Sequence, residues 1–70
     1  MERWNAGEMG CGHLVFELYR RVNELEPGDR LEVIAQDIGA VTDLPAWCRM
    51  TGHELISADH PTYVIERVAS

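Results

Sequence analysis

The chain has 70 residues, with 12 acidic side chains against six basic ones, all arginine, a formal net charge of −6 and 46% hydrophobic residues. A chain this short forms one domain, here residues 1–70, and buries only about 60% of its unfolded surface, which excludes a large enclosed substrate cavity. The hydrophobic content suffices for a packed core, and the negative charge disfavours direct binding to nucleic acid, because phosphate contacts depend on Lys and Arg. The acidity suits transient docking to a basic patch on another protein, or it only keeps the protein soluble.

No run approaches the roughly 18 apolar residues of a membrane span, and the N-terminus does not resemble a signal peptide. We therefore expect a cytoplasmic protein without membrane insertion. Two cysteines, Cys11 and Cys48, are too few for a disulfide framework and favour a reducing compartment. They form no CxxC pair, which excludes a zinc ribbon or a thioredoxin-type motif.

The first half of the chain predicts a strand, a helix and a second strand. Glu2 to Ala6 is a short first strand, and a glycine-containing loop leads from it to the helix. The helix is indicated by one apolar stripe at helical spacing, Leu14, Val15, Leu18, Tyr19, Val22 and Leu25. It ends before the turn signal Pro27-Gly28-Asp29. Apolar and other residues then alternate in a strand of about six residues, 31–36.

The second half predicts another helix followed by two strands. Asp37-Ile38-Gly39 breaks the second strand, and Asp43 is the predicted N-cap, with Pro45 tolerated in the first turn. Gly52 supplies the C-terminal stop of this helix. Its expected apolar face consists of Val41, Leu44, Trp47, Cys48 and Thr51. Residues 53–57 form a short strand, 58–61 a turn, and 62–68 the last strand, in which Tyr63 and Ile65 share a face.

The predicted order is therefore βαβαββ, an α+β fold. The first βαβ unit implies a parallel pair with a right-handed crossover, and the last two strands form an antiparallel hairpin. Two amphipathic helices on one face of a four-stranded mixed sheet complete a two-layer sandwich. The other face of the sheet must be polar or meet a partner, because no chain remains to cover it.

Cys11 is the strongest candidate for chemistry, because it comes just before a predicted helix. Unpaired N–H groups and the positive end of the dipole stabilise a thiolate at that position, and the thiolate is the nucleophilic form of sulfur. Gly10 and Gly12 leave the sulfur accessible, and a protonated His13 would add to thiolate stabilisation. The alternative is an inert loop or core thiol. Cys48, on the apolar face of the second helix, is predicted to be buried and unreactive.

His13, Phe16 and Arg20 fall on the side of the first helix opposite its apolar stripe. They are either a docking patch beside the thiol or three unrelated surface residues. His53 and His60 have no ligand-like spacing with the cysteines, so we expect no metal and no cofactor. For three further residues, we predict roles in a turn, a helix cap and the core, respectively: Asp37, Asp43 and Trp47.

Three segments resemble the TusA/SirA-like family of sulfur carriers. They are Pro27 to Asp37 with the following Gly39-Ala40, then Asp43 to Cys48, and finally Gly52-His53-Glu54-Leu55. Family members carry a similar "PGD-LEV-a-D-GA---DLPAW----GHEL" run, and Trp4-Asn5-Ala6 resembles their first strand. The resemblance implies the βαβαββ sandwich, similar to the C-terminal domain of a bacterial translation initiation factor.

The same resemblance implies that Cys11 carries a persulfide. The chain would accept sulfur from a cysteine desulfurase or rhodanese-type donor and pass it to an acceptor protein, as a carrier rather than a turnover enzyme. Family routes lead to tRNA thiolation, molybdenum cofactor, and sulfur oxidation or thiosulfate use. The chain departs from the family's Cys-Pro-x-Pro motif, because Gly12 and Leu14 replace both prolines. A protein-interaction module that kept the fold and lost the chemistry is therefore the alternative function, and direct RNA binding a third, disfavoured by the charge.

Overall fold

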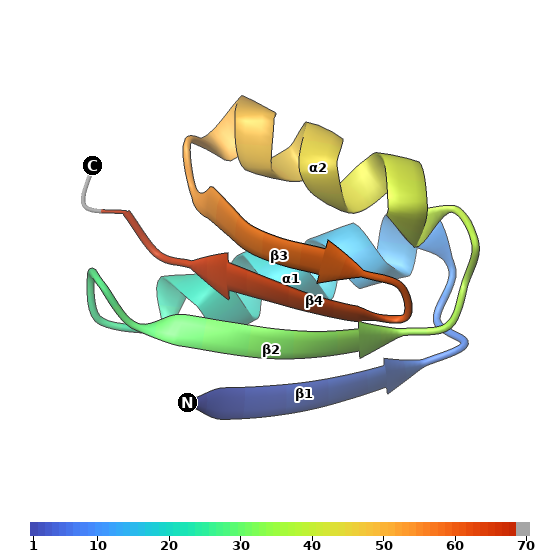
Figure 1. Cartoon of the computed structure of the whole chain (residues 1–70), viewed down its shortest axis with the longest axis horizontal. Coiled ribbons are helices and arrows are strands. Elements are labelled where there is room, and N and C mark those ends of the chain that lie inside the picture. The colour runs from blue at the N-terminus through green and yellow to red at the C-terminus, as the bar shows by residue number, and fades with distance from the viewer. Residues whose placement is uncertain (69–70) are drawn as a thin grey trace.

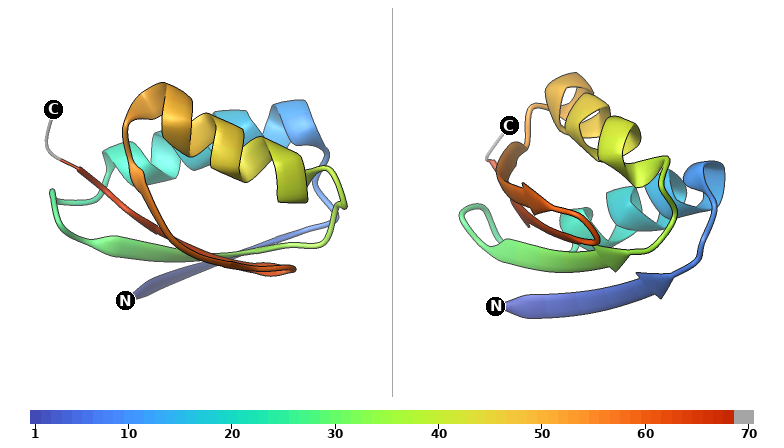
Figure 2. Two further views of the ribbon diagram at one scale, coloured as in Figure 1. Left: turned by 45° about the horizontal axis from the view of Figure 1, so that its top comes forward. Right: turned by 45° about the vertical axis from the view of Figure 1, so that its right-hand side comes forward.

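The computed structural model describes residues 1–68, except for the side chain of Cys11. Its elements are β1 (Glu2–Gly7), α1 (Cys11–Asn23), β2 (Arg30–Ala35), α2 (Ala40–Thr51), β3 (Glu54–Asp59) and β4 (Thr62–Glu66). The sheet order is β1-β2-β4-β3; β1 and β2 are parallel, and β4 runs antiparallel to both of its neighbours. Both helices cover the same face of the sheet (Figures 1 and 2). The predicted two-layer α+β fold with βαβαββ order is thus confirmed.

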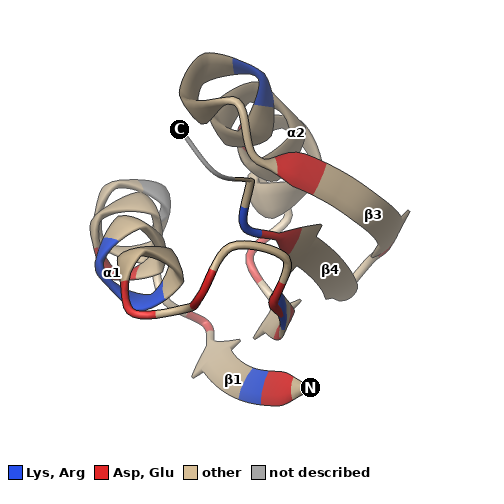
Figure 3. Cartoon of the chain, turned by 90° about the vertical axis from the view of Figure 1, so that its left-hand side faces the viewer, with Lys and Arg blue, Asp and Glu red and all other residues tan. Residues whose placement is uncertain are grey.

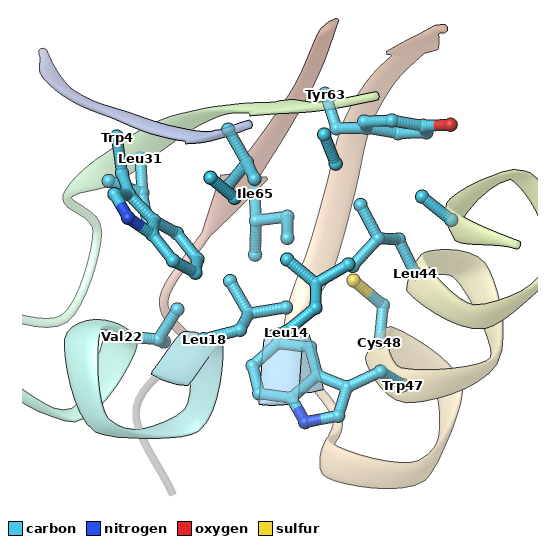
Figure 4. Packing of buried hydrophobic residues seen from close by; sticks show 14 of the residues in the cluster. Trp4, Leu14, Leu18, Val22, Leu31, Leu44, Trp47, Cys48, Tyr63 and Ile65 are labelled. Carbon is cyan, nitrogen blue, oxygen red and sulfur yellow. The ribbon is translucent and has the colours of Figure 1, made fainter. Parts of the chain in front are cut away.

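The core lies between the helix layer and the sheet. Leu14, Leu18 and Val22 repeat every four residues along α1 and are fully buried, as the period of an α-helix requires. From the sheet, the alternate residues Leu31 and Val33 point into the same layer. Figure 4 shows how these side chains meet those of α2 and β4; the further buried residues are Trp4, Ala6, Leu25, Ala35, Ala40, Leu44, Trp47, Cys48, Tyr63 and Ile65.

Two residues predicted on the apolar faces are exposed instead, Tyr19 at 56% and Val41 at 47%. A helix turns by about 100° per residue, so each is rotated by that angle from a buried neighbour, Leu18 or Ala40. That rotation carries both side chains past the edge of the stripe that the sheet covers. The prediction of six apolar residues on one face of the first helix was therefore too broad.

The prediction of Asp43 as the N-cap of the second helix was wrong. The helix α2 begins at Ala40, with Gly39 as N-cap and Asp43 in the first turn. Asp37 starts the helix early: its Oδ2 accepts the Gly39 N–H at 3.0 Å, and its carbonyl accepts the Ala40 N–H at 3.0 Å. A Cβ at position 39 would lie 2.7 Å from that Oδ2, so a larger residue there would have to displace the Asp37 carboxylate. Pro45 consequently lies inside the helix rather than in its first turn.

The last strand ends at Glu66, two residues earlier than predicted, and the Arg67 backbone bonds Gly28 and Asp29, just before β2. The Arg67 guanidinium donates hydrogen bonds to the carbonyl oxygens of Asn23 and Leu25, at the C-terminal end of α1. The last carbonyls of a helix lack partners within it, and the Leu25 carbonyl lies two residues beyond α1, so a cation there satisfies both and suits the negative end of the dipole. The preceding strand β3 runs two residues further than predicted, to Asp59, whereas Gly52 ends α2 with a φ of 85°, as expected.

His53 lies between α2 and β3 and holds the end of the described chain in place. Its Nδ1 accepts the N–H of Val68 at 3.2 Å, and its ring centroid lies 5.6 Å from that of Trp47. Burial, and secondly the nearby Arg67 charge, lower the pKa of His53 below its ordinary value of 6.5. The imidazole is therefore held in its neutral form, with Nδ1 free to accept the hydrogen bond.

The sheet face without helices is polar. Arg3 pairs with Glu32 across β1 and β2, and Arg30 pairs with Glu66 across β2 and β4 at 2.9 Å. The half-buried Ile34 follows these charged positions on the same face of β2, opposite Asn5 of β1 and Thr62 of β4. Of the two expectations for this face, a polar surface is the one observed.

Candidate functional site

One end of the molecule brings together three loops and the start of both helices; we call it the Cys11 end. Because β1 and β2 are parallel, both end there, and the turn between β3 and β4 lies at the same end (Figure 1). The Gln36 N–H donates to the Gly7 carbonyl at 2.9 Å, and the Ala35 N–H donates to the Pro61 carbonyl at 2.9 Å. These bonds join the loops before α1 and before α2 to the β3–β4 turn.

Cys11 is the first residue of α1 rather than the residue before it, so the helix begins one residue earlier than predicted. Gly10 is the N-cap, because its carbonyl accepts the first helical hydrogen bond, from the Leu14 N–H at 2.7 Å. Among the side chains that the structure describes, none caps this helix, and its first turn holds no acidic residue. The first N–H groups of a helix lack carbonyl partners and form the positive end of its dipole. The backbone of residue 11 therefore lies where an anion is stabilised.

The glycines on either side of residue 11 leave open space. Neither Gly10 nor Gly12 has a positive φ, and, its chain neighbours aside, a Cβ added at either position would meet no described atom within 4 Å. Glycine is thus not required by the backbone at these two positions. What the glycines provide is the absence of side chains around the start of α1.

Leu14 has a structural role that the family's second proline could not fill. Its side chain is fully buried in the core, and its N–H makes the first helical bond to Gly10. Proline has no N–H and would lose that bond. In place of the motif's second proline, Leu14 thus provides a hydrogen bond in the first turn of α1 and an additional side chain in the core.

The three residues of the predicted docking patch lie on the exposed side of α1. Phe16 is 68% exposed, and His13 and Arg20 are exposed as well. Arg20 is bound by two carboxylates, Glu17 at 2.9 Å and Glu24 at 3.5 Å. The cation beside Phe16 is therefore neutralised locally, and the ring is the principal feature of this surface.

Cys48 is a buried core thiol, as predicted. Its side chain is 4% exposed and lies among Leu44, Trp47 and Leu14 at the contact between the helices (Figure 4). Burial raises the pKa of its thiol to about 11. Little of Cys48 is therefore in the thiolate form at neutral pH, and its sulfur is expected to be unreactive.

The two histidines that were weighed as metal ligands are separated by the length of a strand. His53 precedes β3 and His60 follows it, and six extended residues span about 20 Å. Among the described residues, no group of three or more His, Cys, Asp or Glu side chains is placed to hold a metal ion. His60 instead forms a hydrogen bond of 2.5 Å with the Tyr63 hydroxyl. Sequence analysis did not find this pair, whose only sequence signal is a spacing of three residues.

The fold and the site together define a class of protein: a small two-layer α+β domain whose first helix begins at a cysteine. A family model described as "Sulfurtransferase TusA" matches residues 3–67. The chain therefore belongs to the TusA family, and the resemblance noted in the sequence is confirmed.

Curated relatives are named as sulfur carrier proteins or putative sulfur carrier proteins. "Sulfur carrier protein TusA" of Pseudomonas aeruginosa is 38% identical over 52 residues, which cover 74% of this chain and 66% of the relative. "Putative sulfur carrier protein YrkI" of Bacillus subtilis is 40% identical over 52 residues, covering 74% and 69%. For "Putative sulfur carrier protein YrkF" of the same organism, the identity is 33% over 55 residues, 79% of this chain but 30% of the relative. The chain thus matches about two thirds of the first two relatives and under a third of YrkF.

Across the described residues, neither helix is long and apolar enough to cross a membrane.

Proposed function

We propose that this protein is a sulfur carrier that holds a persulfide on Cys11 and relays it between two partner proteins. The Cys11 thiolate attacks the terminal sulfur of a donor persulfide; the new S–S bond forms on Cys11, and the donor leaves as a thiolate. An acceptor thiolate then attacks the terminal sulfur on Cys11 and releases the Cys11 thiolate. The donor would be of the desulfurase or rhodanese type.

Membership of the TusA family, with Cys11 at the start of α1, is the observation that carries this proposal. The helix N-terminus supports it, because it stabilises the sulfur anion that each transfer step requires. Gly10 and Gly12 would give the partner access, and His13 would add positive charge when protonated. The relatives' designation as sulfur carriers points to the same role.

Partners would approach along the exposed side of α1, because the opposite side of the helix packs on the sheet. Phe16 is the natural anchor of such a surface, since aromatic side chains often dominate the binding energy of an interface. His13 and Arg20 would flank it. The carrier is then itself the substrate of its two partners rather than a turnover enzyme.

The proposal is tested by loading the protein from a desulfurase with cysteine as the sulfur source. Mass spectrometry should find one added sulfur atom in the wild type and in Cys48→Ser, and none in Cys11→Ser. The loaded protein should then lose that sulfur to an acceptor thiol. Sulfur that remains on Cys11→Ser would overturn the assignment of the carrier residue.

The loss of both motif prolines favours one alternative, a protein-interaction module without sulfur chemistry. Gly12 and Leu14 replace residues of the family motif next to the carrier cysteine. Alkylation rates in the folded protein near neutral pH distinguish the two functions. A Cys11 that reacts no faster than the buried Cys48 would favour the interaction module.

A further inference from the structure

Charged side chains are distributed unevenly along the molecule. Every arginine of the chain lies away from the Cys11 end: at the start of β1 or β2, in the second half of a helix, or just after β4. Figure 3 looks at that remote end and shows arginines alternating with acidic residues on α1, β1 and the end of β4. The arginines are Arg3, Arg20, Arg21, Arg30, Arg49 and Arg67. The Cys11 end therefore contains acidic residues without a compensating arginine or lysine.

Four carboxylates lie at the Cys11 end, each from a different segment. Glu8 is in the loop before α1, Asp37 in the loop before α2, Asp43 in the first turn of α2, and Asp59 at the end of β3. They account for four of the six net negative charges. The two helix N-termini together contribute roughly one positive charge. This end of the molecule is therefore net negative even where the helix dipoles oppose it.

Ile38 adds an exposed apolar side chain to the same end. It is 75% exposed at the tip of the turn between β2 and α2. The turn is held firmly, since the Ala40 N–H donates to the Asp37 carbonyl and the Val41 N–H to the Ile38 carbonyl. An exposed aliphatic side chain on a firmly held turn, at the same end of the molecule as four carboxylates, suits a docking surface in which an apolar centre has a polar rim.

We propose that the surface around Cys11 selects a partner whose own reactive sulfur lies beside an apolar recess with a basic rim. Ile38 enters the recess, and the four carboxylates meet the basic residues. A second copy of this chain is disfavoured as the occupant, because it would bring two acidic ends together. This inference rests on the proposed function, and it adds the chemical character of the partner that approaches Cys11.

The test uses two peptide probes and one small control molecule. Each peptide carries one cysteine as a mixed disulfide with thionitrobenzoate, next to a leucine; one has three arginines and the other three glutamates. The Cys11 thiolate attacks the peptide sulfur, and the coloured thionitrobenzoate anion leaves. Bis(2-hydroxyethyl) disulfide is the neutral control, and Cys11→Ser gives the background rate.

We expect the arginine peptide to react about ten-fold faster than the glutamate peptide at low ionic strength, as in electrostatically steered association. Near 1 M salt, where the Debye length is roughly 3 Å, this ratio should approach one. Charge reversal at the Cys11 end, Glu8→Lys with Asp59→Lys, should reduce the ratio several-fold. The matched control, Glu26→Lys with Glu54→Lys, changes the net charge equally at the remote end and should leave most of the ratio intact.

Ile38→Ser should slow the reaction of the arginine peptide about fivefold, while Ile56→Ser, on β3, should not. Equal rates for the two peptides, or equal effects of the two charge reversals, would overturn the proposed partner. If the neutral disulfide still reacts rapidly in that case, the sulfur-carrier function stands. A Cys11 that is slow with all three reagents would instead count against the carrier function itself.

Discussion

The substitution Cys48→Ser tests whether the two cysteines of this protein have different roles. The side chain of Cys48 is 4% exposed and faces the contact between the two helices and the sheet. A hydroxyl there loses its hydrogen bonds to water, and an unsatisfied buried polar group costs about 1–3 kcal/mol. Within α2, the Thr51 hydroxyl already donates to the carbonyl four residues earlier, that of Trp47, at 2.8 Å. The introduced serine could recover part of the cost in the same way, by bonding the Leu44 carbonyl, so we expect about 1–2 kcal/mol.

Thermal unfolding measures this loss. For a domain of this size, 1 kcal/mol shifts Tm by roughly 4–8 °C, so Cys48→Ser should lower Tm by about 4–16 °C. The control is Cys48→Ala, which removes the sulfur without adding a polar group. Sulfur loading, measured by mass spectrometry below the Tm of each variant, should be unchanged in both.

One result would refute the reasoning entirely. A Cys48→Ser protein with an unchanged Tm and no sulfur uptake would mean that Cys48 is the reactive thiol. A lowered Tm with full sulfur loading is the outcome that agrees with a core role for Cys48 and a carrier role for Cys11.

Three further predictions follow from the structure. Gly12→Pro should stabilise the fold by about 0.4–1 kcal/mol, because Gly12 has no positive φ and its N–H lies in the uncapped first turn; a large loss in denaturant unfolding would contradict this. Phe16→Ala should change stability by less than about 0.5 kcal/mol, since the ring is 68% exposed, yet slow transfer from the donor roughly fivefold or more. The contrasting substitution Leu18→Ala, at a fully buried position, should lower the free energy of unfolding by about 2–5 kcal/mol. Equal transfer rates for wild type and Phe16→Ala would contradict the proposed docking patch. Because the pKa of His53 is lowered in the folded protein, the unfolded chain protonates this imidazole more readily than the folded one. The free energy of unfolding should therefore decline as pH falls below 6.5, and His53→Gln should flatten that part of its pH dependence.

The chain's own pattern was sufficient for the order and type of its elements. A period of two or of nearly four residues between apolar side chains is a local property of the sequence, and it marked the core positions of β2 and most of those of α1 correctly. Turn residues were equally informative: Gly52, for example, adopts the left-handed conformation that ends α2. The position of Cys11 at the start of a helix was also predictable, to within one residue, because the apolar stripe begins at Leu14.

Groups that are distant along the chain decided the rest. The Arg67 guanidinium binds the carbonyls of Asn23 and Leu25, which come near it only in the folded molecule. The width of the buried stripe on α1, and so the exposure of Tyr19, depends on how much of the helix the sheet covers.

The charge around Cys11 also depends on residues that are distant along the chain. Glu8, Asp37, Asp43 and Asp59 are spread over about 50 residues of sequence and share one end of the molecule because the parallel β1 and β2 both end there. No local pattern indicates that these charges gather while every arginine lies elsewhere. The sequence by itself determined the order of the elements and most of their core positions, because these follow from local periodicity and turn chemistry, and it predicted Cys11 as the carrier cysteine. Only the tertiary structure decided which charges surround that cysteine, because strand direction and pairing, not sequence distance, set which segments meet.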